Sequence, residues 1–211
     1  MKGMNKMNSL QTIWRAPRQT LRAKLIEGVE WKAFLLIVAS GFMVSFAQVA
    51  FTPEEEGFAL LPGFGIVLLG VVAAVIGWYV LSGLLHFIAR LFGGTGTYKG
   101  TRFAYAYGQI PYTVVTAILL LPTLFILKEN TFMLDEVLTN TQQNWRMIAA
   151  SIYAIFAIWS VITTIFTVAE AQQFSAWRSL FTFITMFIIL IVLIVAIVFI
   201  LTLLGMFVFM M

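Results

Sequence analysis

The sequence predicts an all-α integral membrane protein that crosses the bilayer five times. Of its 211 residues, 61% are hydrophobic and only 10% are charged, and the mean hydropathy is +0.97. A soluble domain carries about a quarter charged residues, and at this length it could not bury so much apolar surface in one core. Soluble enzymes, secreted disulfide-bonded scaffolds and disordered chains are therefore excluded.

Five apolar segments are each long enough to span the hydrocarbon core of a bilayer, which takes a helix of roughly 20 residues. These segments cover, approximately, residues 33–51, 64–89, 101–127, 146–169 and 180–207. The joints between them are short and more polar, so we expect no soluble domain. The chain then divides into a basic cytoplasmic or interfacial segment, 1–32, and a five-helix membrane domain, 33–211.

The third segment contains Pro111 and Pro122. Proline removes a backbone donor and kinks a helix, which lipid tolerates where neighbouring helices satisfy the freed backbone groups. We therefore predict a kinked third span that lies inside the bundle.

Small residues recur at helical spacing in the second and fourth segments, where they would let helix backbones approach closely. They are Gly63, Gly70 and Gly77 immediately before and within the second segment, and Ala150, Ala154 and Ala157 in the fourth. We expect both helices to be buried in the bundle through these faces.

The distribution of Lys and Arg predicts the orientation, because these residues gather in cytoplasmic loops. Seven precede the first span, whereas the first loop holds only the acidic run Glu54, Glu55 and Glu56. The second loop is again basic, with Arg90 and Lys99. We expect a cytoplasmic N-terminus, an external C-terminus and residence in a bacterial cytoplasmic membrane.

Two stretches of the sequence resemble a known family. In FGGTGTYKGTRFAYAYGQIPYTVV, residues 92–115, a Gly-Gly turn follows a helix, then a loop with Lys, then an aromatic–Gly pair shortly before a proline. These positions are Gly93, Gly94, Lys99, Tyr107, Gly108 and Pro111. Together with IWRAPRQTLRAKL, residues 13–25, this run resembles the Yip family of Ypt/Rab-interacting membrane proteins, in its short prokaryotic-type branch.

The resemblance implies a role in membrane organisation or trafficking, with no catalytic residues. The chain lacks the long N-terminal region and the Asp-Leu-Tyr-Gly-Pro type motif of eukaryotic members. Binding of a Rab GTPase is therefore not expected.

The N-terminal segment combines an apolar stripe, which includes Ile13, Leu21 and Leu25, with basic residues that lie mostly off that stripe. Such a helix is expected on the cytoplasmic leaflet, near anionic headgroups. We expect contacts with lipid or a partner from Arg15, Arg18, Arg22, Lys24, Arg90, Lys99 and Arg102. The alternative is an anchor that only sets the topology.

His86 is the single histidine, and the topology places it at the same leaflet as Glu170. A polar cluster of these two residues with Arg90 and Arg178 would be a candidate functional site, as ionisable residues in membrane segments often are. The alternative is four separate residues at the interface, where charges cost little.

Catalysis has little support in the sequence. There is no cysteine, and one histidine does not supply the three or four ligands of a zinc site. We expect no catalytic residue, cofactor or metal site, and we interpret Glu54–Glu56 as a solvated loop. The expected function is a non-enzymatic scaffold that binds anionic headgroups and an unidentified protein, or a second copy, but not nucleic acid. The alternative is a small-solute transporter or permease subunit.

Overall fold

The computed structural model describes residues 9–51, 63–128 and 138–210, and this part of the chain is helical with short connections and no strand. Five stretches are long and apolar enough to cross a membrane. They are Glu30–Ala47, Gly65–Leu91, Tyr98–Leu127, Asn140–Ala171 and Ala176–Leu203. The predicted all-α architecture with five spans is thus confirmed.

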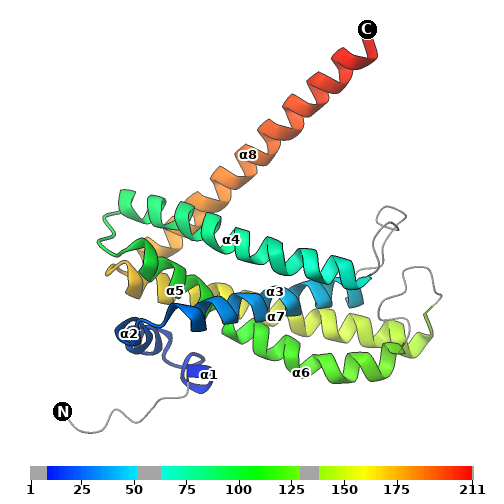
Figure 1. Ribbon diagram of the computed structural model, residues 1–211, viewed down its shortest axis with the longest axis horizontal. Helices are drawn as coiled ribbons and strands as arrows, with labels where there is room; N and C mark the ends of the chain where they lie inside the picture. The colour runs from blue at the N-terminus through cyan, green and yellow to red at the C-terminus, as the bar shows by residue number, and fades with distance from the viewer. Residues whose placement is uncertain (1–8, 52–62, 129–137, 211) are drawn as a thin grey trace.

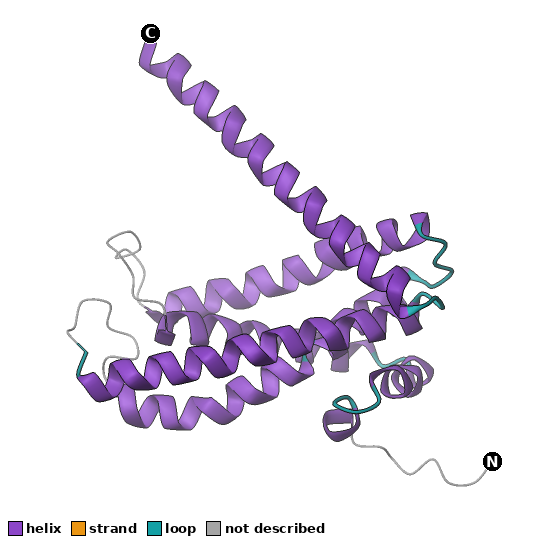
Figure 2. Ribbon diagram, turned by 180° about the vertical axis from the view of Figure 1, so that it is seen from behind, coloured by secondary structure: helices purple, strands orange, loops and turns teal. Residues whose placement is uncertain are grey.

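The helices, in chain order, are α1 (Ser9–Thr12), α2 (Pro17–Glu27), α3 (Glu30–Phe51), α4 (Gly63–Leu91), α5 (Tyr98–Gly108), α6 (Ile110–Leu127), α7 (Asn140–Ala171) and α8 (Ala176–Met210). Helices α3, α4, α6 and α7 run side by side, and α8 leaves the bundle at an angle (Figures 1 and 2). We call the end where α3, α5 and α8 begin and α4 and α7 finish the basic end.

Helix α2 packs on α5 and α7 at the basic end (Figure 1). Pro17 lies in its first turn, where the missing N–H costs nothing. Gly28 ends it in the left-handed conformation at φ 64°, which glycine adopts freely. Ile13 and Leu21 are fully buried in the core. The apolar stripe of the N-terminal segment therefore docks it on the bundle, and contact of its basic residues with headgroups stays a prediction.

The third span is broken near Pro111, as the sequence predicted. Helix α5 ends at Gly108 and α6 begins at Ile110, with Gln109 between them. The N–H of Tyr112 donates to the Ser160 hydroxyl of α7 at 2.9 Å, so a neighbouring helix satisfies a backbone group at the break. Pro122 lies inside α6.

The expected packing face of α7 was wrong, because Ala150, Ala154 and Ala157 are exposed. The buried face carries a tyrosine and hydroxyl residues, among them Tyr153, Ser160, Thr163, Thr164 and Thr167. Threonine can be buried here because its hydroxyl bonds to its own helix, as Thr164 does to the Ser160 carbonyl at 2.6 Å.

Close packing of small residues is present where α3 meets α4. A Cβ on Gly41 would lie 2.5 Å from the Cβ of Ala74, and one on Gly70 would overlap the Ser45 side chain. Gly70 therefore serves the close approach that the sequence predicted. Gly77 does not, because a Cβ there would meet nothing within 4 Å.

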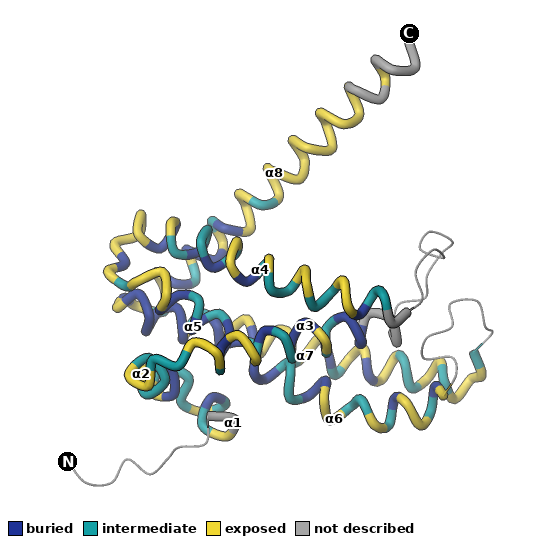
Figure 3. Tube along the Cα trace, viewed as in Figure 1, coloured by how far each residue is buried: buried dark blue, intermediate teal, exposed yellow. Residues whose placement is uncertain are grey.

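Helix α8 contacts α4 and α7, and those of its described residues that are buried or half-buried all lie before Ile191. Phe183 and Met186 are buried there, and the Ser179 hydroxyl donates to the Ile165 carbonyl at 2.7 Å. From Ile191 to Leu203 every residue is exposed (Figure 3). Nearly all of these side chains are apolar, which suits a surface that faces lipid.

Candidate functional site

The basic end gathers most of the charge in the described part of the chain. Nine Lys and Arg lie there against three Glu. The basic residues are Arg15, Arg18, Arg22, Lys24, Lys32, Arg90, Lys99, Arg102 and Arg178. They come from five helices and their connections, so only the folded bundle brings them to one end of the molecule.

Glu30, at the start of α3, holds two of these basic residues. Arg102 Nη2 lies 3.1 Å and Lys99 Nζ 3.4 Å from Glu30 Oε1. The Arg102 guanidinium also lies 5.0 Å from the Tyr98 ring centroid and 5.6 Å from that of Trp78, within cation–π range. Arg102 is therefore enclosed by side chains of α3, α4 and α5 and is poorly placed to bind a ligand.

Glu27 neutralises the second pair of basic residues. Lys24 Nζ lies 2.8 Å and Lys32 Nζ 3.4 Å from its carboxylate oxygens. The hydrogen bond from Lys24 is the main reason that the pKa of Glu27 lies below its ordinary value. These exposed pairs hold the α2–α3 connection at the surface of the bundle, where each contributes about 0–1 kcal/mol.

The third acidic residue, Glu170, lies near the end of α7 and pairs with Arg22 of α2. Arg22 Nε donates to Glu170 Oε1 at 2.7 Å. The carboxylate side chain is only 7% exposed, whereas the Arg22 side chain is 69% exposed. Hydrogen bonding and the charge of Glu170 raise the pKa of Arg22 further above its ordinary value. This pair joins the N-terminal segment to the bundle.

Three exposed arginines at the basic end, Arg15, Arg90 and Arg178, form no ion pair with any described residue, and we call them the free arginines. A Cβ on Gly93 would lie 3.7 Å from Arg178 Nη1, so the start of α8 lies against the turn that follows Arg90. Arg18 is half-buried, with its guanidinium 5.9 Å from the Phe166 ring centroid.

His86 belongs to a hydrogen-bonded group of polar side chains that the sequence did not reveal. Gln172 Nε2 donates to Thr101 Oγ1 at 2.6 Å and lies 3.0 Å from His86 Nδ1. The predicted partner Glu170 is instead bonded to Arg22. Gln172 and Thr101 have ordinary polar side chains 71 residues apart, and nothing in their local sequence marks them as partners.

The glycine loop between α4 and α5 docks on the end of α7. Gly93 has φ 82°, a conformation that glycine adopts without strain. A Cβ on Gly94 would lie 2.6 Å from Gln172 Oε1, and one on Gly96 would overlap the Ala171 carbonyl. The Thr95 N–H donates to the Gln172 carbonyl at 3.0 Å. The loop is thus a surface that packs against the backbone at the end of α7.

The aromatic–Gly pair that follows is also part of the core. Tyr107 is 3% exposed, and a Cβ on Gly108 would lie 2.8 Å from the Cα of Thr164 in α7. Pro111 is buried at the start of α6. At these positions α5 and α6 pack closely against α7.

The family model described as the Yip1 domain matches residues 11–210, nearly the whole chain. The chain belongs to the Yip1 domain family. Over 97 aligned residues this Yip1-domain protein is 21% identical to an uncharacterised protein of Methanocaldococcus jannaschii. The alignment covers 46% of this chain and 68% of that protein. No solved structure matches it. The resemblance found in the sequence is confirmed, and the protein is an integral membrane protein.

The family loop therefore has a physical explanation in this Yip1-domain protein: at Gly94, Gly96 and Gly108 a Cβ would come closer than 3.0 Å to backbone atoms. Among the described residues, no group of three His, Asp or Glu side chains could hold a metal ion. The acidic run Glu54–Glu56 lies outside the described residues.

Proposed function

We propose that this Yip1-domain protein is a non-enzymatic scaffold of the cytoplasmic membrane, which binds anionic lipid headgroups at its basic end and presents that surface to a protein partner. The observation that carries the proposal is the set of free arginines. Every basic side chain that forms an ion pair at this end is paired with one of the three glutamates, Glu27, Glu30 or Glu170. Charge left over after internal pairing is available to a ligand.

The proposal requires the basic end to face the cytoplasm. The excess of Lys and Arg at this end supports that orientation, because such residues are retained on the cytoplasmic side. Helix α8 begins at the basic end (Figure 1). If the basic end faces the cytoplasm, α8 crosses the membrane once more and the C-terminus lies outside.

Reporter fusions test the orientation. A reporter enzyme that folds only outside the cytoplasm is expected to be active when fused after the last residue, and inactive when fused after Leu91, at the start of the loop that follows α4. Activity in the loop together with inactivity at the C-terminus would show that the bundle is inverted, and the proposed binding surface would then face the wrong side.

Neutralising the free arginines tests headgroup binding. Each basic residue near an anionic surface contributes about 1 kcal/mol, so the triple variant R15A/R90A/R178A is expected to bind anionic lipid roughly 100-fold more weakly. Native mass spectrometry of protein released from nanodiscs that contain equal amounts of phosphatidylglycerol and phosphatidylcholine measures which lipid is retained.

The control variant is Lys128→Ala, which removes an exposed basic residue at the opposite end of the bundle. It should retain phosphatidylglycerol as the unmodified protein does. Equal retention by the triple variant would contradict the proposal.

The transporter alternative finds less support. It relied on His86 and Glu170 acting together, and their side chains are bonded to different partners, Gln172 with Thr101 and Arg22 respectively. The scaffold is the function that these contacts favour.

A further inference from the structure

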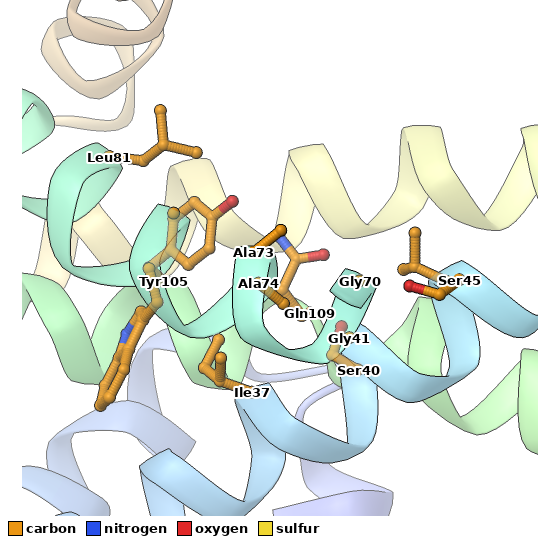
Figure 4. A pocket seen from close by; sticks show the side chains of 13 residues that line it. Ile37, Ser40, Gly41, Ser45, Gly70, Ala73, Ala74, Leu81, Tyr105 and Gln109 are labelled. Carbon is orange, nitrogen blue, oxygen red and sulfur yellow. The ribbon is translucent and has the colours of Figure 1, made fainter. Parts of the chain in front are cut away.

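A cavity of ≈ 320 Å³ lies within the membrane-spanning part of the bundle. Its walls come from α3, α4 and the junction of α5 with α6 (Figure 4). This volume falls at the lower end of the range for small-molecule pockets, about 300–1,000 Å³. None of the residues that line it is charged.

Four polar side chains face the cavity without a hydrogen-bond partner among the described residues: Ser40, Ser45, Tyr105 and Gln109. Ser40 is 6% and Ser45 is 4% exposed, so both side chains are largely enclosed by the helices. An unpaired polar group in an apolar setting costs about 1–3 kcal/mol. These side chains indicate that a hydrogen-bonding group enters the cavity.

Gly77 shows that the space is not a packing contact. Gly70, two turns earlier in α4, is covered by Ser45 of α3, as expected where small residues join two helices. Gly77 lines the cavity, and a Cβ on it would meet nothing within 4 Å. The room left by the absent side chain is therefore available to another molecule.

The depth of the polar side chains limits what that molecule can be. Glu30 and its ion pairs with Lys99 and Arg102 lie at the polar end of α3. At 1.5 Å per residue, Ser40 lies roughly 15 Å and Ser45 roughly 22 Å further along that helix, near the middle of a bilayer core about 30 Å thick. The phosphate and ester groups of a diacyl lipid stay near the surface and do not reach this depth.

We infer that the cavity binds a neutral single-chain amphiphile, such as a long-chain alcohol. Its hydroxyl would exchange hydrogen bonds with Ser40, Tyr105 and Gln109, and its chain would lie along Gly77 and Leu81. A carboxylate is disfavoured because the walls offer no counter-charge, and burial of an unpaired charge is costly. The surrounding lipid supplies such molecules laterally. The site is independent of the basic end and goes beyond the proposed function.

Photolabelling in proteoliposomes tests the inference. The probe is a hexadecanol that carries a diazirine and an alkyne, added to the full-length protein in phosphatidylcholine. Mass spectrometry of the peptides is expected to find label on α3, α4 and α5 around the cavity, and unmodified hexadecanol should compete with it. Label that is not competed, or that is spread along Ile191–Leu203 of α8, would overturn the inference.

Filling the cavity should abolish the labelling. Gly77→Leu places a side chain in the open space and is expected to lower cavity labelling by about tenfold. Val72→Leu, on the same helix but 56% exposed, is the matched control and should label normally. If Gly77→Leu does not fold, Tyr105→Phe, which removes one hydroxyl and keeps the ring, should lower labelling several-fold.

Normal cavity labelling in both cavity variants would refute the site. A hexadecanoic acid probe of the same length should label less than the alcohol, and equal labelling would refute the preference for a neutral head group. The variant R15A/R90A/R178A should label normally, so a failure of the proposed headgroup binding is distinguishable from a failure of this site.

Discussion

Replacement of Gly96 by alanine is expected to destabilise the bundle by about 1–3 kcal/mol. The new Cβ would overlap the carbonyl of Ala171 and lie 3.0 Å from the Cα of Gln172. These neighbours are backbone atoms at the end of α7, so no rotamer change can relieve the clash. The α4–α5 loop must move away and lose the hydrogen bond from Thr95 to Gln172.

Thermal unfolding in mild detergent, followed by tryptophan fluorescence and by gel filtration, measures the effect. Gly77→Ala is the matched control, because a Cβ there meets nothing within 4 Å. In the middle of a helix this change should stabilise by about 0.5–1 kcal/mol. Equal melting temperatures for the Gly96 variant and the unmodified protein would show that the loop does not dock on α7.

Replacement of Trp78 by alanine is expected to cost about 3–5 kcal/mol, the range for a large buried aromatic residue. Trp78 is 3% exposed and lies between α3 and α5. Its Nε1–H donates to the Arg102 carbonyl at 2.9 Å, and its ring lies beside the Arg102 guanidinium. The alanine variant loses the packing, the hydrogen bond and the cation–π contact together.

Trp78→Phe separates these contributions. Phenylalanine keeps an aromatic ring in the core but cannot donate to the Arg102 carbonyl, so the expected cost is about 1 kcal/mol, near that of a single hydrogen bond. Unfolding by denaturant in the same detergent compares the two variants. If both lose the same stability, burial of the ring is not what Trp78 chiefly contributes to the bundle.

Hydropathy and proline positions were enough to predict the helical spans. Five apolar runs became five candidate spans, and the break expected at Pro111 occurs between Gly108 and Ile110. Both features depend on local physics, since a bilayer selects apolar helices and proline interrupts one. The family resemblance also came from a continuous stretch of the chain, residues 92–115, and the family is confirmed.

Helix faces were harder to predict, because two different residue patterns on one helix can each form a packing face. The alanines of α7 looked like a packing face, but they are exposed, and the buried face carries threonines such as Thr164 whose hydroxyls bond within the helix. The sequence contains both patterns on one helix. Only the position of α5 and α6 decides which of them is buried.

The sequence alone thus determined that this protein is a five-span membrane helix bundle of the Yip1 family with an excess of basic residues at one end. The tertiary structure decided which charges are already neutralised and which space is left open. Arg22 and Glu170 are 148 residues apart, and the cavity beside Gly77 has walls from three separate parts of the chain. The apolar character of a segment can be read from its own residues. Ion pairs and cavities between distant segments depend on distances that exist only after the helices have packed.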